Sequence, residues 1–181
     1  MRKIFTIIFY SLLFSCSAGI SSLYNHDYKL SSENANSKTT NLSVNIPNGW
    51  FEAEDNECNC IDLWLVRDDY SATLNFTQLF ADKTVFSSSS ENKLKHMTEF
   101  SKVFVKAKLG KNFTSFFNEE HFEINNKKFY AFEYKNEENK TIRIVVFNHN
   151  EKYFELKAIP AKNISNKDLF TVQNSVLSSI K

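Results

Sequence analysis

Glycine and proline are scarce in this chain, with only 3 Gly and 2 Pro among 181 residues. Collagen-like and proline-rich disordered chains contain far more of both. The glycines, Gly19, Gly49 and Gly110, are too far apart to form a glycine-rich loop around a phosphate group. The Gly-x-Ser-x-Gly motif of serine hydrolases is also missing. We therefore expect a protein that is not an enzyme and holds no cofactor or metal.

Neither sign of charge dominates, since the chain has 22 basic and 21 acidic side chains. Without Arg2 and Lys3 the balance becomes 20 to 21. Nucleic-acid binding depends on an excess of Lys and Arg, so we expect no nucleic-acid partner.

The N-terminal apolar run is short, because the eleven residues Ile4–Phe14 fall well below the ~20 that a membrane-spanning helix needs. A basic start, Met1-Arg2-Lys3, precedes this run. The combination is typical of a signal peptide, which we assign to residues 1–15.

The residues Leu13-Phe14-Ser15-Cys16 resemble the lipobox of bacterial lipoproteins. The resemblance implies that the Cys16 thiolate accepts the lipid and that the acyl chains anchor the protein to a membrane. Ser17 stands where an inner-membrane lipoprotein of enterobacteria carries Asp, which favours the outer membrane. The predicted location is thus the cell envelope, facing the periplasm or the exterior. The alternative is an ordinary secretory peptide cleaved near Ser17-Ala18-Gly19.

A polar segment follows, rich in Ser, Asn, Thr and Lys. This composition is typical of a flexible linker. We therefore predict an acylated Cys and tether over residues 16–41 and a single folded domain over residues 42–181.

The predicted domain begins with strands, because apolar and polar residues alternate. The expected strands are 42–46, a short one at 50–51, 61–66 and one within 70–80. A helix over 91–109 follows, with Leu94, Met97, Phe100, Phe104 and Ala107 on its buried face. Gly110 is the expected C-terminal cap.

The second half of the sequence predicts a meander of strands and a final helix. The expected strands are 113–117 (or a start at 121–124), 129–134, 142–147 and 153–159, with a turn at Asn125-Asn126. Ser165 and Asp168 resemble a capping box that starts the last helix. This order predicts an α+β fold, a twisted antiparallel sheet packed by helices.

The segment Val44-Asn45-Ile46-Pro47-Asn48-Gly49-Trp50, together with this order of elements, resembles the PsbP/DcrB-like family of α/β/α sandwiches. The resemblance covers residues 42–181. It implies a non-enzymatic accessory or binding module, and it assigns no ligand-binding residue.

Two groups of residues with reactive side chains stand out. Cys58-Asn59-Cys60 is a candidate disulfide in an oxidising envelope, although the ring would be strained. A redox or soft-metal site and two inert thiols are the alternatives. Glu119-Glu120-His121 combines carboxylates with an imidazole, but alternation along a strand sends Glu120 and His121 to opposite faces, so we interpret them as surface residues.

Aromatic residues make up 15% of the chain, and Tyr130, Phe132 and Tyr134 share one face of a predicted strand. If exposed, this face is a candidate aromatic binding surface. Alternatively, these side chains fill the core. The function we expect is a lipid-anchored module that binds a protein partner or assists assembly. The alternative is a lipid-anchored binding protein for a small apolar ligand.

Overall fold

The computed structural model describes residues 24–54, 61–80, 90–162 and 164–181. Cys16, Cys58 and Cys60 lie outside these ranges, and so does the predicted signal peptide. Among the described residues, no helix combines the length and apolar character needed to cross a membrane.

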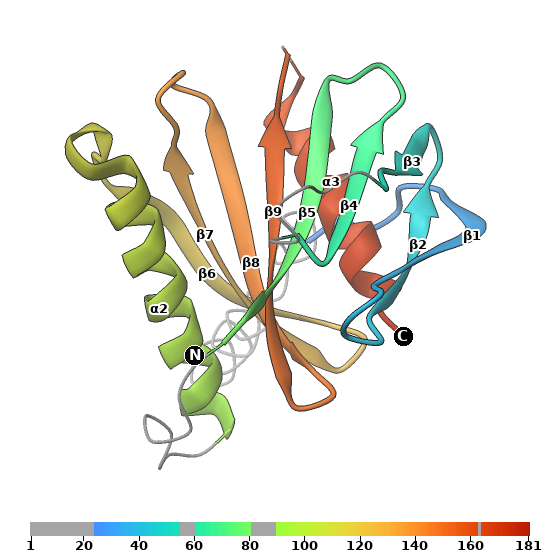
Figure 1. Cartoon of the computed structure of the whole chain (residues 1–181), viewed down its shortest axis with the longest axis horizontal. Helices are drawn as coiled ribbons and strands as arrows, with labels where there is room; N and C mark the ends of the chain where they lie inside the picture. Colours follow the sequence, from blue (N-terminus) through green and yellow to red (C-terminus); the bar gives the residue numbers. More distant parts are fainter. Residues whose placement is uncertain (1–23, 55–60, 81–89, 163) are drawn as a thin grey trace, which may run out of the picture.

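A seven-stranded, fully antiparallel sheet forms the centre of the domain (Figure 1). Its strands, in spatial order, are β3 (Trp50–Glu52), β4 (Leu63–Arg67), β5 (Ala72–Leu79), β9 (Lys152–Pro160), β8 (Thr141–His149), β7 (Lys127–Lys135) and β6 (Phe116–Ile124). The last four strands form the predicted meander. The asparagines Asn125 and Asn126 adopt φ of 50° and 62° between β6 and β7, as expected for a tight hairpin turn.

The strand β6 unites the two alternative starts that the sequence allowed. Its pairing with β7 is interrupted between Phe117 and Glu120, and Asn118 at φ 47° marks a bulge there. The bulge hides the regular alternation of apolar residues, which explains why the sequence suggested two separate strands.

Two helices cover opposite faces of the sheet (Figure 1). The helix α2 (Ser90–Leu109) packs on β7, β8 and β9, and α3 (Asn166–Ser178) packs on β9 from the other side. Since both faces are covered, β8 is buried almost along its whole length. The predicted α+β fold is confirmed.

The end of α2 and the start of α3 each test a prediction made from local sequence. Gly110 adopts φ 52° and begins the short helix η2 (Gly110–Asn112) directly after the last residue of α2, Leu109, so the predicted end of α2 is confirmed. Ser165 precedes α3 as expected, but its side chain makes no cap hydrogen bond. Its carbonyl instead accepts the Leu169 N–H at 3.1 Å, so the predicted capping box is wrong.

The buried face of α2 differs from the predicted one. Leu94 and Met97 are buried, but Phe104 is 58% exposed and Ala107 is exposed, while Val105 and Leu109 are buried instead. Thr98 and Ser101 are buried as well, so small polar side chains form part of the contact with the sheet and the apolar residues alone do not mark the buried face.

Part of the predicted tether is folded. The strand β1 (Leu30–Asn36) pairs antiparallel with β2 (Ser43–Pro47) in a separate two-stranded sheet, next to α3. Ala35 of β1 is fully buried. The predicted boundary at residue 42 is therefore wrong, and the folded domain includes residues 24–41. The sequence of β1 is too polar to predict a strand, because backbone pairing rather than side-chain burial holds it.

Candidate functional site: a groove beside helix α2

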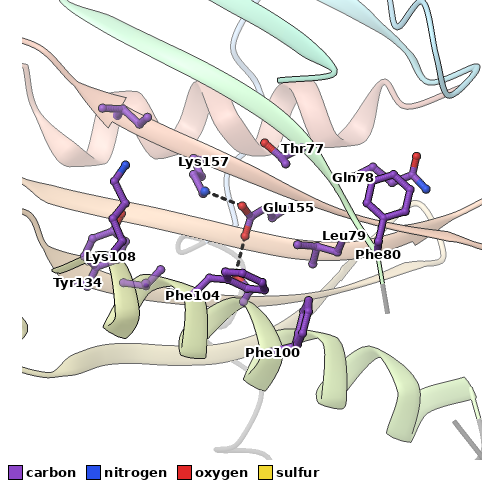
Figure 2. A pocket seen from close by; sticks show the side chains of 13 residues that line it. Thr77, Gln78, Leu79, Phe80, Phe100, Phe104, Lys108, Tyr134, Glu155 and Lys157 are labelled. Carbon is purple, nitrogen blue, oxygen red and sulfur yellow. Dashed lines mark hydrogen bonds and ion pairs between the residues drawn. The ribbon is translucent and has the colours of Figure 1, made fainter. Parts of the chain in front are cut away.

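A groove of about 430 Å³ lies between one side of α2 and the strands β5 and β9 (Figure 2). Its apolar lining comes from α2, from β5 with the residue after it, and from β9: Phe100, Phe104, Val105, Leu79, Phe80 and Ile159. Phe80 is 74% exposed and Phe104 58% exposed. Such exposure of large apolar side chains beside a cavity is typical of binding surfaces.

A buried carboxylate lies in the middle of the groove (Figure 2). Glu155 is only 5% exposed. The Ser101 hydroxyl donates to its Oε2 at 2.5 Å, and Lys157 Nζ lies 2.5 Å from its Oε1. A buried charge costs free energy unless it is paired and hydrogen-bonded, and here both oxygens have partners.

Two hydrogen-bond donors of the groove remain available. Burial, and secondarily the charge of Glu155, raise the pKa of Tyr134 to about 12, so its hydroxyl is a protonated donor at neutral pH. Within the described residues, neither Tyr134 nor the exposed Lys108 has a side-chain partner. The groove therefore offers an O–H and an ammonium group to a ligand.

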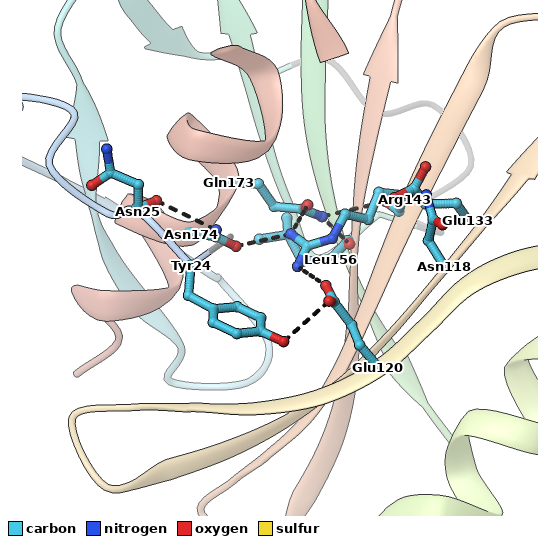
Figure 3. A network of polar contacts seen from close by, with 9 residues as sticks. All are labelled: Tyr24, Asn25, Asn118, Glu120, Glu133, Arg143, Leu156, Gln173 and Asn174. Carbon is cyan, nitrogen blue, oxygen red and sulfur yellow. Dashed lines mark hydrogen bonds and ion pairs between the residues drawn. The ribbon is translucent and has the colours of Figure 1, made fainter. Parts of the chain in front are cut away.

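A second polar cluster lies under α3 and centres on Arg143, which is 3% exposed (Figure 3). Its guanidinium donates to Gln173 Oε1 at 2.9 Å, to Asn174 Oδ1 at 2.8 Å and to Glu120 Oε1 at 3.0 Å. Burial lowers the pKa of Arg143, and the neighbouring carboxylate of Glu120 opposes this shift. The rings of Phe122 and Phe170 lie 5.2 and 5.5 Å from the guanidinium carbon.

This cluster also holds the N-terminal segment (Figure 3). The Tyr24 hydroxyl donates to Glu120 Oε2 at 3.1 Å, and the Tyr24 ring stacks on Phe122 with centroids 4.9 Å apart. The Asn174 amide donates to the Asn25 carbonyl at 3.4 Å. All three contacts join residues of the predicted tether to the sheet and α3, so we interpret this cluster as structural.

The structure separates the three residues of the candidate aromatic surface. Tyr130, Phe132 and Tyr134 do share the face toward α2. Phe132, however, is fully buried, so a continuous exposed aromatic surface there is wrong. The cause is α2, which covers this face of β7. Only Tyr134 reaches the groove.

Glu120 and His121 lie on opposite faces, as the alternation predicts. His121 stacks near Tyr130 with centroids 5.8 Å apart, on the α2 side. Glu120 is not a plain surface residue, since it pairs with the buried Arg143.

Sequence reasoning missed Glu155 and Arg143. Arg143 is the one Lys, Arg, Asp or Glu in the apolar strand Thr141–His149, and Glu155 stands between the apolar residues Phe154 and Leu156 in the strand Lys152–Pro160. A charge in such a position needs a buried partner, and this signal could have identified both residues. The helical partners Ser101, Gln173 and Asn174 could not be predicted, because they are distant in sequence from these strands.

Comparison with known proteins places this geometry among known folds. No protein-family model and no curated protein sequence matches the chain. A solved structure does: the solution structure of cyanobacterial PsbP (CyanoP) from Synechocystis sp. PCC 6803, with a TM-score of 0.54 and 16% identity over 94% of this chain and 98% of that one. The fold is PsbP-like. At this identity the likeness concerns the fold alone.

A second similar structure is a crystal structure from Bacteroides thetaiotaomicron VPI-5482. Its TM-score is 0.44 at 12% identity, covering 77% of this chain and 44% of that one. The PsbP-like arrangement therefore rests on the cyanobacterial structure, which matches over nearly the full length of both chains.

Proposed function

We propose that this PsbP-like chain is a lipid-anchored, non-enzymatic binding protein of the cell envelope, and that the groove beside α2 holds a small molecule with a large apolar part. The observation that carries the proposal is the groove itself, about 430 Å³ with Phe80, Phe100 and Phe104 in its lining. Ligand pockets typically measure about 300–1,000 Å³ and are mostly apolar with a few convergent polar groups.

The groove contains those polar groups as well. Glu155 is held by two partners, while Lys108 and Tyr134 lie in the same lining. A ligand can thus bury apolar surface against the phenylalanines and be oriented by hydrogen bonds, which together determine affinity and specificity.

Nile red, an uncharged apolar dye, tests the groove. The exported chain, residues 16–181, is prepared with Cys16→Ser and without detergent. We expect the fluorescence of the dye to increase when it binds this protein. Phe104→Ser should weaken this binding about tenfold, because it removes a large apolar contact. Phe104 is 58% exposed, so the variant should fold normally.

Val103→Ser is the matched control. Val103 is 61% exposed on the same helix, but it does not line the groove. Equal binding by the Phe104 and Val103 variants would show that the dye binds elsewhere and would contradict the proposal.

A protein partner is the second candidate. It is favoured by Phe80, Val103 and Phe104, which are 74%, 61% and 58% exposed, because exposed apolar side chains are typical of protein interfaces. Pull-down from solubilised membranes of the native host tests it. If a protein partner covers this area, both Val103→Ser and Phe104→Ser should reduce its recovery. If the ligand is a small molecule, only Phe104→Ser should reduce binding.

The proposed anchor at Cys16 places the domain near the membrane. Tyr24 is held against the sheet, and the eight peptide steps from Cys16 to Tyr24 reach at most about 26–29 Å. The outer membrane remains the favoured location because of Ser17.

Mass spectrometry of the mature N-terminus from the native host tests the anchor. We expect Cys16 as the first residue, carrying acyl chains, and loss of membrane association in Cys16→Ser. A mature chain that begins near Ser17-Ala18-Gly19 without lipid would instead establish ordinary secretion.

A further inference from the structure

The groove beside α2 has chemically different ends (Figure 2). Lys108 and Tyr134 lie at one end, while Leu79, Phe80 and the uncharged Gln78 lie at the other, with Phe100 and Phe104 along the helix. A ligand with a charged head at the Lys108 end and an apolar part along the phenylalanines matches this lining.

The charges that a ligand can reach are positive. The groove is lined by two lysines, Lys108 and Lys157, and one glutamate, Glu155, which leaves a net charge of +1. The side chain of Glu155 is 7% exposed and both of its oxygens already have partners. Lys108 is exposed and has no partner among the described residues, so it is the charge that meets the ligand first.

Tyr134 adds a neutral donor at the same end. Its hydroxyl stays protonated at neutral pH because burial raises its pKa to about 12. A carboxylate accepts hydrogen bonds well from both an ammonium group and a hydroxyl. A cationic head would instead face Lys108 and find the carboxylate of Glu155 already engaged.

We propose that the ligand of this groove is a single-chain amphiphile with a carboxylate head, which binds with the head at Lys108 and Tyr134 and the apolar chain along Phe104, Phe100 and Leu79. This inference rests on the proposed function, because it names the ligand class of the same groove.

Three probes with one apolar chain and different heads test the inference: decanoate, decanol and decylamine. Each is titrated calorimetrically, below its micelle concentration, into the exported chain carrying Cys16→Ser. We expect decanoate to bind about tenfold more tightly than decanol, as a charge-assisted hydrogen bond provides, and decylamine to bind no better than decanol.

Variants then locate the head. In Lys108→Gln and in Tyr134→Phe, the affinity for decanoate should fall severalfold, toward that for decanol in the same variant, and the affinity for decanol should fall less, because its hydroxyl carries no charge. Lys111→Gln is the matched control, since Lys111 is exposed nearby, carries the same charge and does not line the groove. An equal loss in the Lys111 variant would show a nonspecific effect of charge and overturn the assignment of the head.

The outcomes separate the inference from the proposed function. Equal affinity for decanoate and decanol would overturn the carboxylate head but leave an apolar ligand in the groove. Tightest binding of decylamine would overturn it in favour of Glu155 as the recognising group. Failure of all three probes to bind would overturn the proposed function and the inference with it.

Discussion

Replacing Arg143 by Met is expected to lower the free energy of unfolding by about 3–5 kcal/mol, the cost of breaking a buried ionic cluster by removing one partner. Gln173 and Asn174 are 0% and 2% exposed, so their side-chain oxygens would lose their donor without gaining water. Of its hydrogen-bond donors among the described residues, Glu120 would keep the Tyr24 hydroxyl. Urea denaturation followed by circular dichroism measures the change.

Arg67→Gln is the control for this prediction. Arg67 lies at the surface, with its Nε 3.6 Å from Asp69 and a side chain that is 37% exposed. Exposed ion pairs contribute about 0–1 kcal/mol, so this variant should unfold almost like the wild type. Arg143→Lys should lie between the two, because one ammonium cannot reproduce the fork of a guanidinium. If Arg143→Met costs no more than Arg67→Gln, the cluster does not hold the domain together.

The variant Phe132→Ala should also lose about 3–5 kcal/mol of stability, as for other buried phenylalanines truncated to alanine. Phe132 is fully buried and packs edge-on against Phe116 with centroids 5.1 Å apart. The cavity left under α2 adds to the lost transfer free energy. Thermal and urea unfolding of the same preparation give the measurement.

Phe80→Ala serves as its comparison, since Phe80 is 74% exposed. Surface substitutions usually change stability by about 0.5 kcal/mol or less. A similar, small effect of both substitutions would mean that Phe132 belongs to an exposed aromatic surface after all.

The elements set by local signals were predictable. The long helix ends at Gly110 because a residue with positive φ is needed there, and the meander turns at Asn125 and Asn126 for the same reason. Alternating apolar residues identified β2, β4, β5 and β7 to β9, and the order of elements led to the correct fold class.

The strand β1 and the bulge in β6 were not predictable to the same degree. Ala35 is the only fully buried apolar residue in β1, and backbone hydrogen bonds carry no signal in the sequence. The bulge at Asn118 shifts the alternation by its extra residues, so neither half of the strand appears complete.

Except for β1 and the two halves of β6, the sequence alone established which segments become helices and strands, because the hydrophobic period and the turn residues act over a few neighbouring positions. It also supplied the expectations for Cys16, Cys58 and Cys60, which the described residues do not test. The difference between Phe132 in the core and Phe104 beside the groove came from the tertiary structure. Burial depends on where α2 lies across the sheet, and that position results from the packing of side chains distant in the chain. The same packing brings Ser101 to Glu155 and Arg143 to Gln173, so the groove and the buried cluster exist only in the folded protein.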